Sequence, residues 1–293
     1  MNGNMNLEYL ESIQGKAVRV FKGGPESRLG QLLSVKSDYL VLNTKDEGVV
    51  VYQTGHIKSV IEDTTTSMNT LNSAAVTDMM STIDDTQSFA EVLSAMKDSF
   101  VRIDRGGPEA RNGRLLDVKN DYLVLYTEKD GVVFYQLEHV KSISKAVKNN
   151  NNNNEDDQSS NANMMVDNFV KPEYIEADDF AGLLTKMRYM WITINRGGPE
   201  SMKGVLADSS DGHLVLISEK EVIRIPTFHI RSISYVLKNE SNQNAENNNQ
   251  DQQNSENNNN QNQNQNNQNN NQNNNSKKSY SIKMYSGSTK SRL

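Results

Sequence analysis

The sequence predicts a mainly β protein made of three repeated, small, five-stranded barrels, each preceded by a short helix, with disordered linkers and a disordered tail. Three observations lead to this expectation. One loop motif recurs three times, each copy is followed by short apolar runs, and the polar residues concentrate between and after the copies. Short runs of apolar and β-branched residues bounded by turn residues are typical of β-strands.

The recurring loop motif is Lys-Gly-Gly-Pro-Glu at residues 22–26 and Arg-Gly-Gly-Pro-Glu at residues 105–109 and 196–200. A further glycine stands five residues after each proline, and the sequence Leu-Val-Leu follows each time. Self-similarity at fixed offsets identifies a repeated structural unit. The three copies are called repeat 1, repeat 2 and repeat 3 below.

Each repeat is expected to contain five short strands. In repeat 1, residues Ala17–Phe21 alternate in polarity and end at the Gly-Gly-Pro turn signal. Four further runs follow, at Leu29–Val35, Tyr39–Asn43, Gly48–Gln53 and His56–Ile61. Five strands within about 45 residues suit a small, strongly bent barrel better than a sandwich. The order of a helix and five strands resembles Sm-like or SH3-like small barrels.

A short amphipathic helix is predicted before each of the last two barrels. Apolar residues at Phe89, Val92, Leu93 and Met96 recur with helical spacing inside the stretch Ser88–Lys97. The stretch Asp179–Arg188 has the same spacing, and repeat 1 has a weaker version of it at residues 7–13.

Composition divides the chain into seven segments. The barrels are expected at residues 1–62, 87–148 and 171–238, the linkers at 63–86 and 149–170, an Asn/Gln-rich tract at 239–275 and a basic Ser/Lys-rich tail at 276–293. A small helix is expected around Ala74–Met80 in the first linker. Because so small a barrel buries little surface, we expect the three barrels to pack together or the chain to self-associate.

The overall composition excludes several classes of protein. The 293 residues contain no cysteine, which excludes disulfide frameworks, thiolate metal sites and cysteine nucleophiles. No apolar stretch approaches the roughly 18–20 residues of a membrane-spanning helix, and no secretory signal is recognisable. The net charge is −6 and each repeat is nearly neutral. Nucleic-acid binding is therefore not favoured, and Sm-like RNA binding is kept only as the alternative function.

The Gly-Gly-Pro loops have two interpretations. Successive backbone N–H groups next to a Lys or Arg would suit an anion such as phosphate. The simpler interpretation is a turn, in which glycine permits positive φ and proline fixes the next φ. The residues concerned are Gly23, Gly24, Pro25, Gly106, Gly107, Pro108, Gly197, Gly198 and Pro199.

Three histidines, His56, His139 and His229, occupy the same place in the three repeats. They would form a metal site only if the repeats brought them together, and the simpler hypothesis is one local hydrogen bond in each repeat. Neither a catalytic motif nor a cofactor motif is recognisable. Asp38 and Asp121 also recur, but Gly212 takes their place in repeat 3, as expected of a turn position.

The end of the chain has two kinds of composition. In residues 239–275, 30 of 37 residues are Asn or Gln, which predicts disorder with a tendency to self-associate. The last 18 residues have five basic residues, no acidic residue and six serines. Such a segment suits acidic partners, and phosphorylation would reverse its charge.

The loops, the Asp-Tyr-Leu-Val-Leu strands at 38–42 and 121–125, and the Ser-Lys-Lys-Ser element at 276–279 resemble the spore coat protein B family of endospore-forming bacilli. The resemblance implies a structural protein rather than an enzyme, made in the mother cell cytoplasm and located in the outer layer of the spore coat. It also implies other spore coat proteins as partners, among them a coat-associated kinase. The implied phosphorylation sites are Ser276, Ser279, Ser281, Ser286, Ser288 and Ser291.

Overall fold

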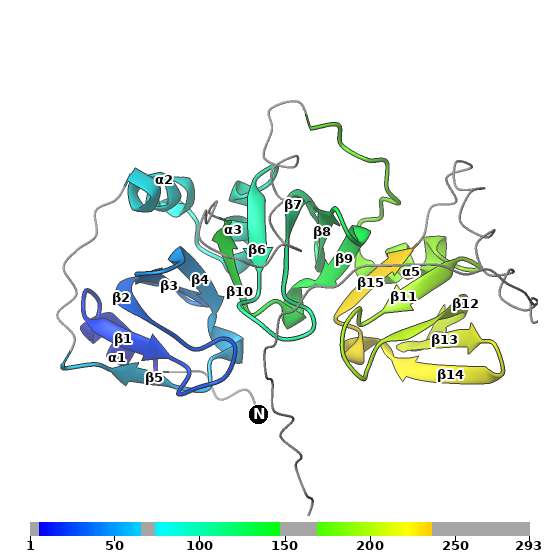
Figure 1. Cartoon of the computed structure of the whole chain (residues 1–293), viewed down its shortest axis with the longest axis horizontal. Coiled ribbons are helices and arrows are strands. Elements are labelled where there is room, and N and C mark those ends of the chain that lie inside the picture. The colour runs from blue at the N-terminus through cyan, green and yellow to red at the C-terminus, as the bar shows by residue number, and fades with distance from the viewer. Residues whose placement is uncertain (1–5, 66–73, 147–168, 236–293) are drawn as a thin grey trace, which may run out of the picture. The chain divides into compact units, whose positions relative to one another are not determined.

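The computed structural model describes residues 6–65, 74–146 and 169–235 (Figure 1). Residues up to Lys238 form one compact unit. Its strands join in a single antiparallel sheet of 15 strands, accompanied by a few short helices, so the prediction of a mainly β protein is confirmed. The Asn/Gln-rich tract and the Ser/Lys-rich tail lie outside the described residues.

The five strands of each repeat follow the apolar runs of the sequence. Repeat 1 contains β1 (Ala17–Val20), β2 (Arg28–Val35), β3 (Tyr39–Thr44), β4 (Gly48–Gln53) and β5 (Val60–Glu62). Repeat 2 contains β6 (Phe100–Ile103), β7 (Arg111–Val118), β8 (Tyr122–Thr127), β9 (Gly131–Gln136) and β10 (Ser142–Lys145). Repeat 3 contains β11 (Trp191–Ile194), β12 (Met202–Ser210), β13 (His213–Ser218), β14 (Glu221–Pro226) and β15 (Ser232–Tyr235).

The helices also lie where their apolar spacing predicts them. They are α1 (Leu7–Ser12), α2 (Ala74–Ile83), α3 (Phe89–Ala95) and α5 (Phe180–Lys186). The side chains of Ser88 and Asp179 cap α3 and α5 by accepting hydrogen bonds from backbone N–H groups of the first turn. None of the helices among the described residues has the length and apolarity that crossing a membrane requires.

The strand order explains how the repeats are joined. Within every repeat the order is fourth, third, second, first, fifth strand. The fourth and fifth strands of a repeat do not pair with each other. Instead β10 pairs with β4, and β15 pairs with β9. The prediction of three closed barrels is therefore not confirmed. The fourth and fifth strands, which would have to pair to close a barrel, pair with strands of neighbouring repeats instead.

The fifth strand of each repeat begins later than the apolar pattern predicts. A single 3-10 turn separates the fourth and fifth strands, at Thr54–His56, Leu137–His139 and Thr227–His229. The strand expected from His56 therefore begins only at Val60.

A glycine at the same position of each second strand lets that strand bend close to the third. A Cβ added to Gly30 would lie 2.5 Å from the backbone oxygen of Asn43, and Gly113 and Gly204 are equally crowded. A bulge follows two residues further on in all three repeats. This explains the glycine that follows each Gly-Gly-Pro loop.

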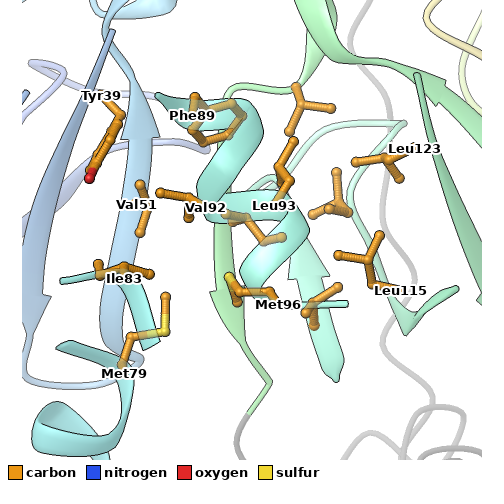
Figure 2. Close-up of a cluster of buried hydrophobic side chains, with 14 of the residues drawn as sticks. Tyr39, Val51, Met79, Ile83, Phe89, Val92, Leu93, Met96, Leu115 and Leu123 are labelled. Atoms are coloured by element: carbon orange, nitrogen blue, oxygen red, sulfur yellow. The ribbon is translucent and has the colours of Figure 1, made fainter. Parts of the chain in front are cut away.

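The apolar cores extend across the boundaries between repeats. Figure 2 shows Val51 of repeat 1 next to Ile83 of α2, with Tyr39 of repeat 1 on the side of Phe89, and with Val92 and Leu93 of α3 and the following Met96 in the same cluster. The same cluster continues to Leu115 and Leu123 of repeat 2. A second cluster joins the opposite face of β8 and β9 to α5 and repeat 3. Burial of this apolar surface holds the three repeats in one unit.

Candidate functional site: the junctions between repeats

The two junctions between repeats are built from the residues that recur in the sequence. At each junction the fourth strand of one repeat pairs with the fifth strand of the next. Ser142 lies opposite Tyr52 at the first junction, and Ser232 lies opposite Tyr135 at the second. Four kinds of contact repeat around this pairing, and they involve the loop glutamate, an arginine, a histidine and an aspartate.

The glutamate of the Gly-Gly-Pro-Glu loop crosses the junction. Glu26 is buried, and its carboxylate accepts hydrogen bonds from Arg105 N (2.8 Å) and Ser142 Oγ (2.9 Å) of repeat 2. Glu109 is buried in the same way and accepts from Ser232 Oγ (2.6 Å) of repeat 3. Because a buried carboxylate is costly without such donors, these contacts fix how one repeat meets the next.

An arginine of the following repeat completes the contact. Arg105 is buried, and its guanidinium donates to Glu47 Oε2 (3.1 Å) and Ser144 Oγ (2.9 Å). Burial alone would raise the pKa of Glu47, but the hydrogen bond from Arg28 and the charge of Arg105 lower it below its usual range. Glu47 thus remains ionised as the partner of a buried cation.

The second junction repeats this arrangement. Arg196 donates to Ser234 Oγ and to the carboxylate of Asp130. Burial opposes ionisation of Asp130, but Arg196 and Arg111 outweigh it and lower its pKa. Arg105 and Arg196 are the residues that open the second and third loop motifs, so one loop supplies both the arginine for one junction and the glutamate for the next.

A second buried carboxylate lies at the first junction. Asp104 Oδ1 accepts from the backbone N–H groups of Lys141 (2.8 Å) and Ser142 (3.3 Å). Burial, and then the charge of Glu26, raise the pKa of Asp104 to about 6. Repeat 3 has Asn195 at the same position, and its Oδ1 accepts from Arg231 N (2.8 Å) without any charge.

The glycines and prolines of neighbouring loops lie against each other. A Cβ added to Gly106 would lie 2.5 Å from Pro25 Cβ, and one added to Gly197 would lie 2.4 Å from Pro108 O. Gly23, in contrast, has open space around it. The second glycine of each loop has positive φ: Gly24 (89°), Gly107 (91°) and Gly198 (74°). The first glycine thus admits the preceding loop, and the second one makes the turn.

Two of the recurrent histidines reach the next repeat. His56 Nε2 lies 2.6 Å from Glu138 O, and His139 Nε2 lies 2.7 Å from Phe228 O. Burial lowers the pKa of His56, although its bond to the Glu138 carbonyl opposes this. The ring of His229 lies against that of Phe228. Within the described residues no group of three or more His, Cys, Asp or Glu side chains is placed to hold a metal ion.

The recurrent aspartates bind the helix that opens the next repeat. Asp38 accepts from Phe89 N (2.9 Å), the first residue of α3, and Asp121 accepts from Phe180 N (2.8 Å), the first residue of α5. Repeat 3 is the last of the three and has Gly212 at this position.

Two tyrosines support the loop glutamates from their own repeat. The hydroxyls of Tyr52 and Tyr135 donate to the backbone oxygens of Glu26 (3.0 Å) and Glu109 (3.1 Å). Burial raises the pKa of both tyrosines above the usual range. Both hydroxyls consequently stay protonated, which they must be to donate these bonds.

Of the predicted residues, the structure brings Pro25, Gly106, Pro108, Gly197, Gly198, His56 and His139 to the junctions. The predicted phosphorylation sites, Ser276, Ser279, Ser281, Ser286, Ser288 and Ser291, lie outside the described residues. The sequence interpretation missed Glu26, Glu47, Arg105 and Asp104 as contacts between repeats. A signal existed, since Glu47 and Asp130 are acidic while the equivalent residue of repeat 3 is Lys220.

These features define a protein of tandem β repeats whose recurrent polar residues serve as contacts between repeats. No family model matches the chain. A search of curated proteins finds spore coat protein B of Bacillus subtilis (strain 168), 37% identical over 226 residues. The match covers 77% of this chain, and the chain spans about half (54%) of the length of that relative. The chain is therefore similar to spore coat protein B over most of its own length.

Proposed function

We propose that this protein is a structural component of the outer spore coat, made in the mother cell and built into the coat as a preassembled set of three small barrel-like repeats. The similarity to a spore coat protein over 77% of the chain carries this proposal. An enzymatic role is not part of it.

The junctions support a structural role on physical grounds. The loop glutamates and the arginines that meet at the junctions are largely buried, and each has a partner in the neighbouring repeat. Removing one member of such a buried contact leaves the other groups without hydrogen-bond partners, which lowers the free energy of unfolding by about 1–3 kcal/mol for each group. The repeats therefore favour one fixed arrangement, which suits a component of a layered assembly.

The proposal includes the end of the chain as a regulated arm. A coat-associated kinase would phosphorylate the serines of residues 276–293 and replace a basic segment by an acidic one, because each phosphate adds about −1.5 to −2 charges. The arm would then bind different coat partners, or different copies of this chain, before and after modification. Phosphopeptide mapping of this segment from mature spores tests the idea, and an unmodified segment would contradict it.

Fractionation tests the location. We expect the protein in the outer-coat extract of purified spores and not in growing cells. Abundant protein in growing cells with none in coat extracts would refute the proposal.

A pair of variants tests whether the junctions matter for assembly. Glu109→Ala removes a buried contact between repeats 2 and 3, so we expect less protein in the coat extract and a less stable protein in solution. Glu200→Ala changes the equivalent glutamate of repeat 3, which is exposed and pairs with Arg231 of its own repeat. This control should enter the coat normally. If both variants entered the coat equally although Glu109→Ala was less stable, the junctions would not be needed for coat assembly.

A further inference from the structure

The strand β5 lies at one edge of the sheet that the described residues form. The fifth strands of repeats 2 and 3 pair with the fourth strand of the preceding repeat. In contrast, β5 pairs with β1 on one side, and no strand among the described residues lies on its other side. The residues of repeat 1 that correspond to the receiving side of a junction are called the β5 edge below, and they are Lys22, Gly23, Lys58, Ser59, Val60 and Ile61.

The backbone of the β5 edge has the groups that a junction uses. On the side of β1, Phe21 N donates to Ser59 O (2.8 Å). Alternate residues of an antiparallel strand bond to opposite sides, so Val60 directs its N–H and C=O groups outward. The equivalent residue of repeat 2, Ile143, pairs with Val51 at the first junction. The β5 edge therefore offers the same backbone groups by which repeat 2 binds repeat 1.

The serine that receives the loop glutamate at a junction is also present. At the second junction, Ser232 Oγ accepts from Arg196 N (3.4 Å) and donates to the carboxylate of Glu109 (2.6 Å). In repeat 1, Ser59 Oγ accepts from Lys22 N (3.0 Å) in the same way. This bond leaves the Ser59 O–H available for a carboxylate from outside.

The β5 edge has the space that a neighbouring loop fills at the junctions. A Cβ added to Gly106 or Gly197 would meet the proline of the preceding loop, whereas one added to Gly23 would meet nothing within 4 Å. Ile61 is 41% exposed, while the equivalent Ser144 is 2% exposed. Both differences are those expected of the receiving half of a junction that stands open.

The charge of the β5 edge indicates which partner fits. Lys22 and Lys58 are exposed, and neither forms an ion pair with the residues that the structure describes. The arginines equivalent to Lys22 pair with carboxylates of the preceding repeat. The strand β14 of a second copy would instead bring Lys220 towards Lys22, and would place Pro226 where an N–H donor is needed. An acidic strand of another protein fits better than a second copy.

We propose that the β5 edge binds an edge strand of another protein, which extends the sheet as one repeat extends the next. The partner strand donates a backbone N–H to Lys58 O and brings two carboxylates, one to Ser59 and one to Lys22. The short β5 is long enough, because the first junction pairs only two residues of β10 with β4. The proposal is independent of the function proposed above.

A variant of the chain itself supplies the probe. Lys220→Asp/Pro226→Gln gives β14 the acidic residue and the N–H donor of a junction strand, and Gly23→Val in the same molecule closes its own β5 edge. We expect this triple variant to form a one-to-one complex with the wild-type chain in sedimentation and titration calorimetry. The matched control carries Gly23→Val alone and should not bind the wild-type chain.

Changes in the wild-type partner locate the contact. Lys22→Glu should weaken its complex with the triple variant about tenfold or more, because it brings like charges together. Lys129→Glu makes the same charge change at an exposed position between β8 and β9 and should bind normally. Both should unfold at the temperature of the wild-type chain.

Three results would overturn the proposal. The first is the lack of a complex between the triple variant and the wild-type chain, and the second is equal binding of Lys22→Glu and Lys129→Glu. The third is association of the wild-type chain with itself that Gly23→Val removes, which would assign the β5 edge to a second copy.

Discussion

Asp104 and Asn195 occupy the same position in repeats 2 and 3, and they differ only in carrying a charge or a neutral amide. Both accept a hydrogen bond from the backbone of their own repeat, from Lys141 N and Arg231 N respectively. Asp104 is buried near the carboxylate of Glu26. We therefore predict that Asp104→Asn stabilises the protein at neutral pH, because the amide keeps the bond and removes one of two neighbouring buried charges.

The size of the gain follows from the pKa of Asp104. Burial and the charge of Glu26 raise this pKa from 3.8 to about 6. The rise is about two pKa units, and at about 1.4 kcal/mol per unit it corresponds to an upper value of about 3 kcal/mol. We expect a gain of about 1–3 kcal/mol in the free energy of unfolding, since the amide is not a perfect replacement for a protonated carboxyl group.

The pH dependence gives a sharper test than the size. Between pH 4 and pH 6 the unfolded protein releases the Asp104 proton while the folded protein keeps it, so the folded state loses stability as the pH rises through this range. The stability gain of Asp104→Asn should be near zero below about pH 4, grow up to about pH 6 and stay constant above it.

Urea unfolding at several pH values between 3.5 and 8 measures this gain. The reverse change, Asn195→Asp, provides the matched comparison and should destabilise the protein most above about pH 6. An equal effect of Asp104→Asn at all pH values, or a loss of stability at pH 7, would refute the reasoning.

Two further predictions compare Gly106 and Arg105 at the first junction with the equivalent residues of repeat 1, Gly23 and Lys22. Gly106→Ala should destabilise the protein, because the new Cβ would lie 2.5 Å from Pro25, while Gly23→Ala should be nearly neutral; thermal unfolding distinguishes them. Arg105→Lys should lower the free energy of unfolding by about 2 kcal/mol or more, since lysine cannot reach Glu47 and Ser144 together. Lys22→Arg, at an exposed position, should change the free energy of unfolding little. Equal effects of Gly106→Ala and Gly23→Ala, or of Arg105→Lys and Lys22→Arg, would contradict the role given to the junction.

Much of the local structure follows from the sequence, because its determinants lie close together along the chain. Apolar runs bounded by glycine and turn residues located the strands, and the spacing of Phe89, Val92, Leu93 and Met96 located α3. The start of β5 was misplaced because His56 and the residues after it have the composition of a strand. In the structure His56 lies in a short 3-10 turn, where its ring bonds to the backbone of Glu138, a residue far away in the sequence.

The pairing between repeats was not predictable in the same way. Five strands of this size can close on themselves or leave both edges to neighbours, and the apolar pattern is identical for the two outcomes. The information lies in residues that two repeats share and the third lacks. Arg105 and Arg196 correspond to Lys22 of repeat 1, and Asp38 and Asp121 correspond to Gly212 of repeat 3.

The same comparison concerns β14, which is the edge of the sheet among the described residues. At the junctions, the backbone N–H groups of Gln53 and Gln136 donate to the carbonyl oxygens of Lys141 and Arg231, directly before the fifth strand of the next repeat. Repeat 3 has Pro226 at this position, without an N–H group, and Lys220 where a partner for a buried arginine would stand. A fourth repeat would thus meet a missing donor and two like charges. We expect contacts with other molecules on the faces of this sheet or at the β5 edge rather than at the β14 edge.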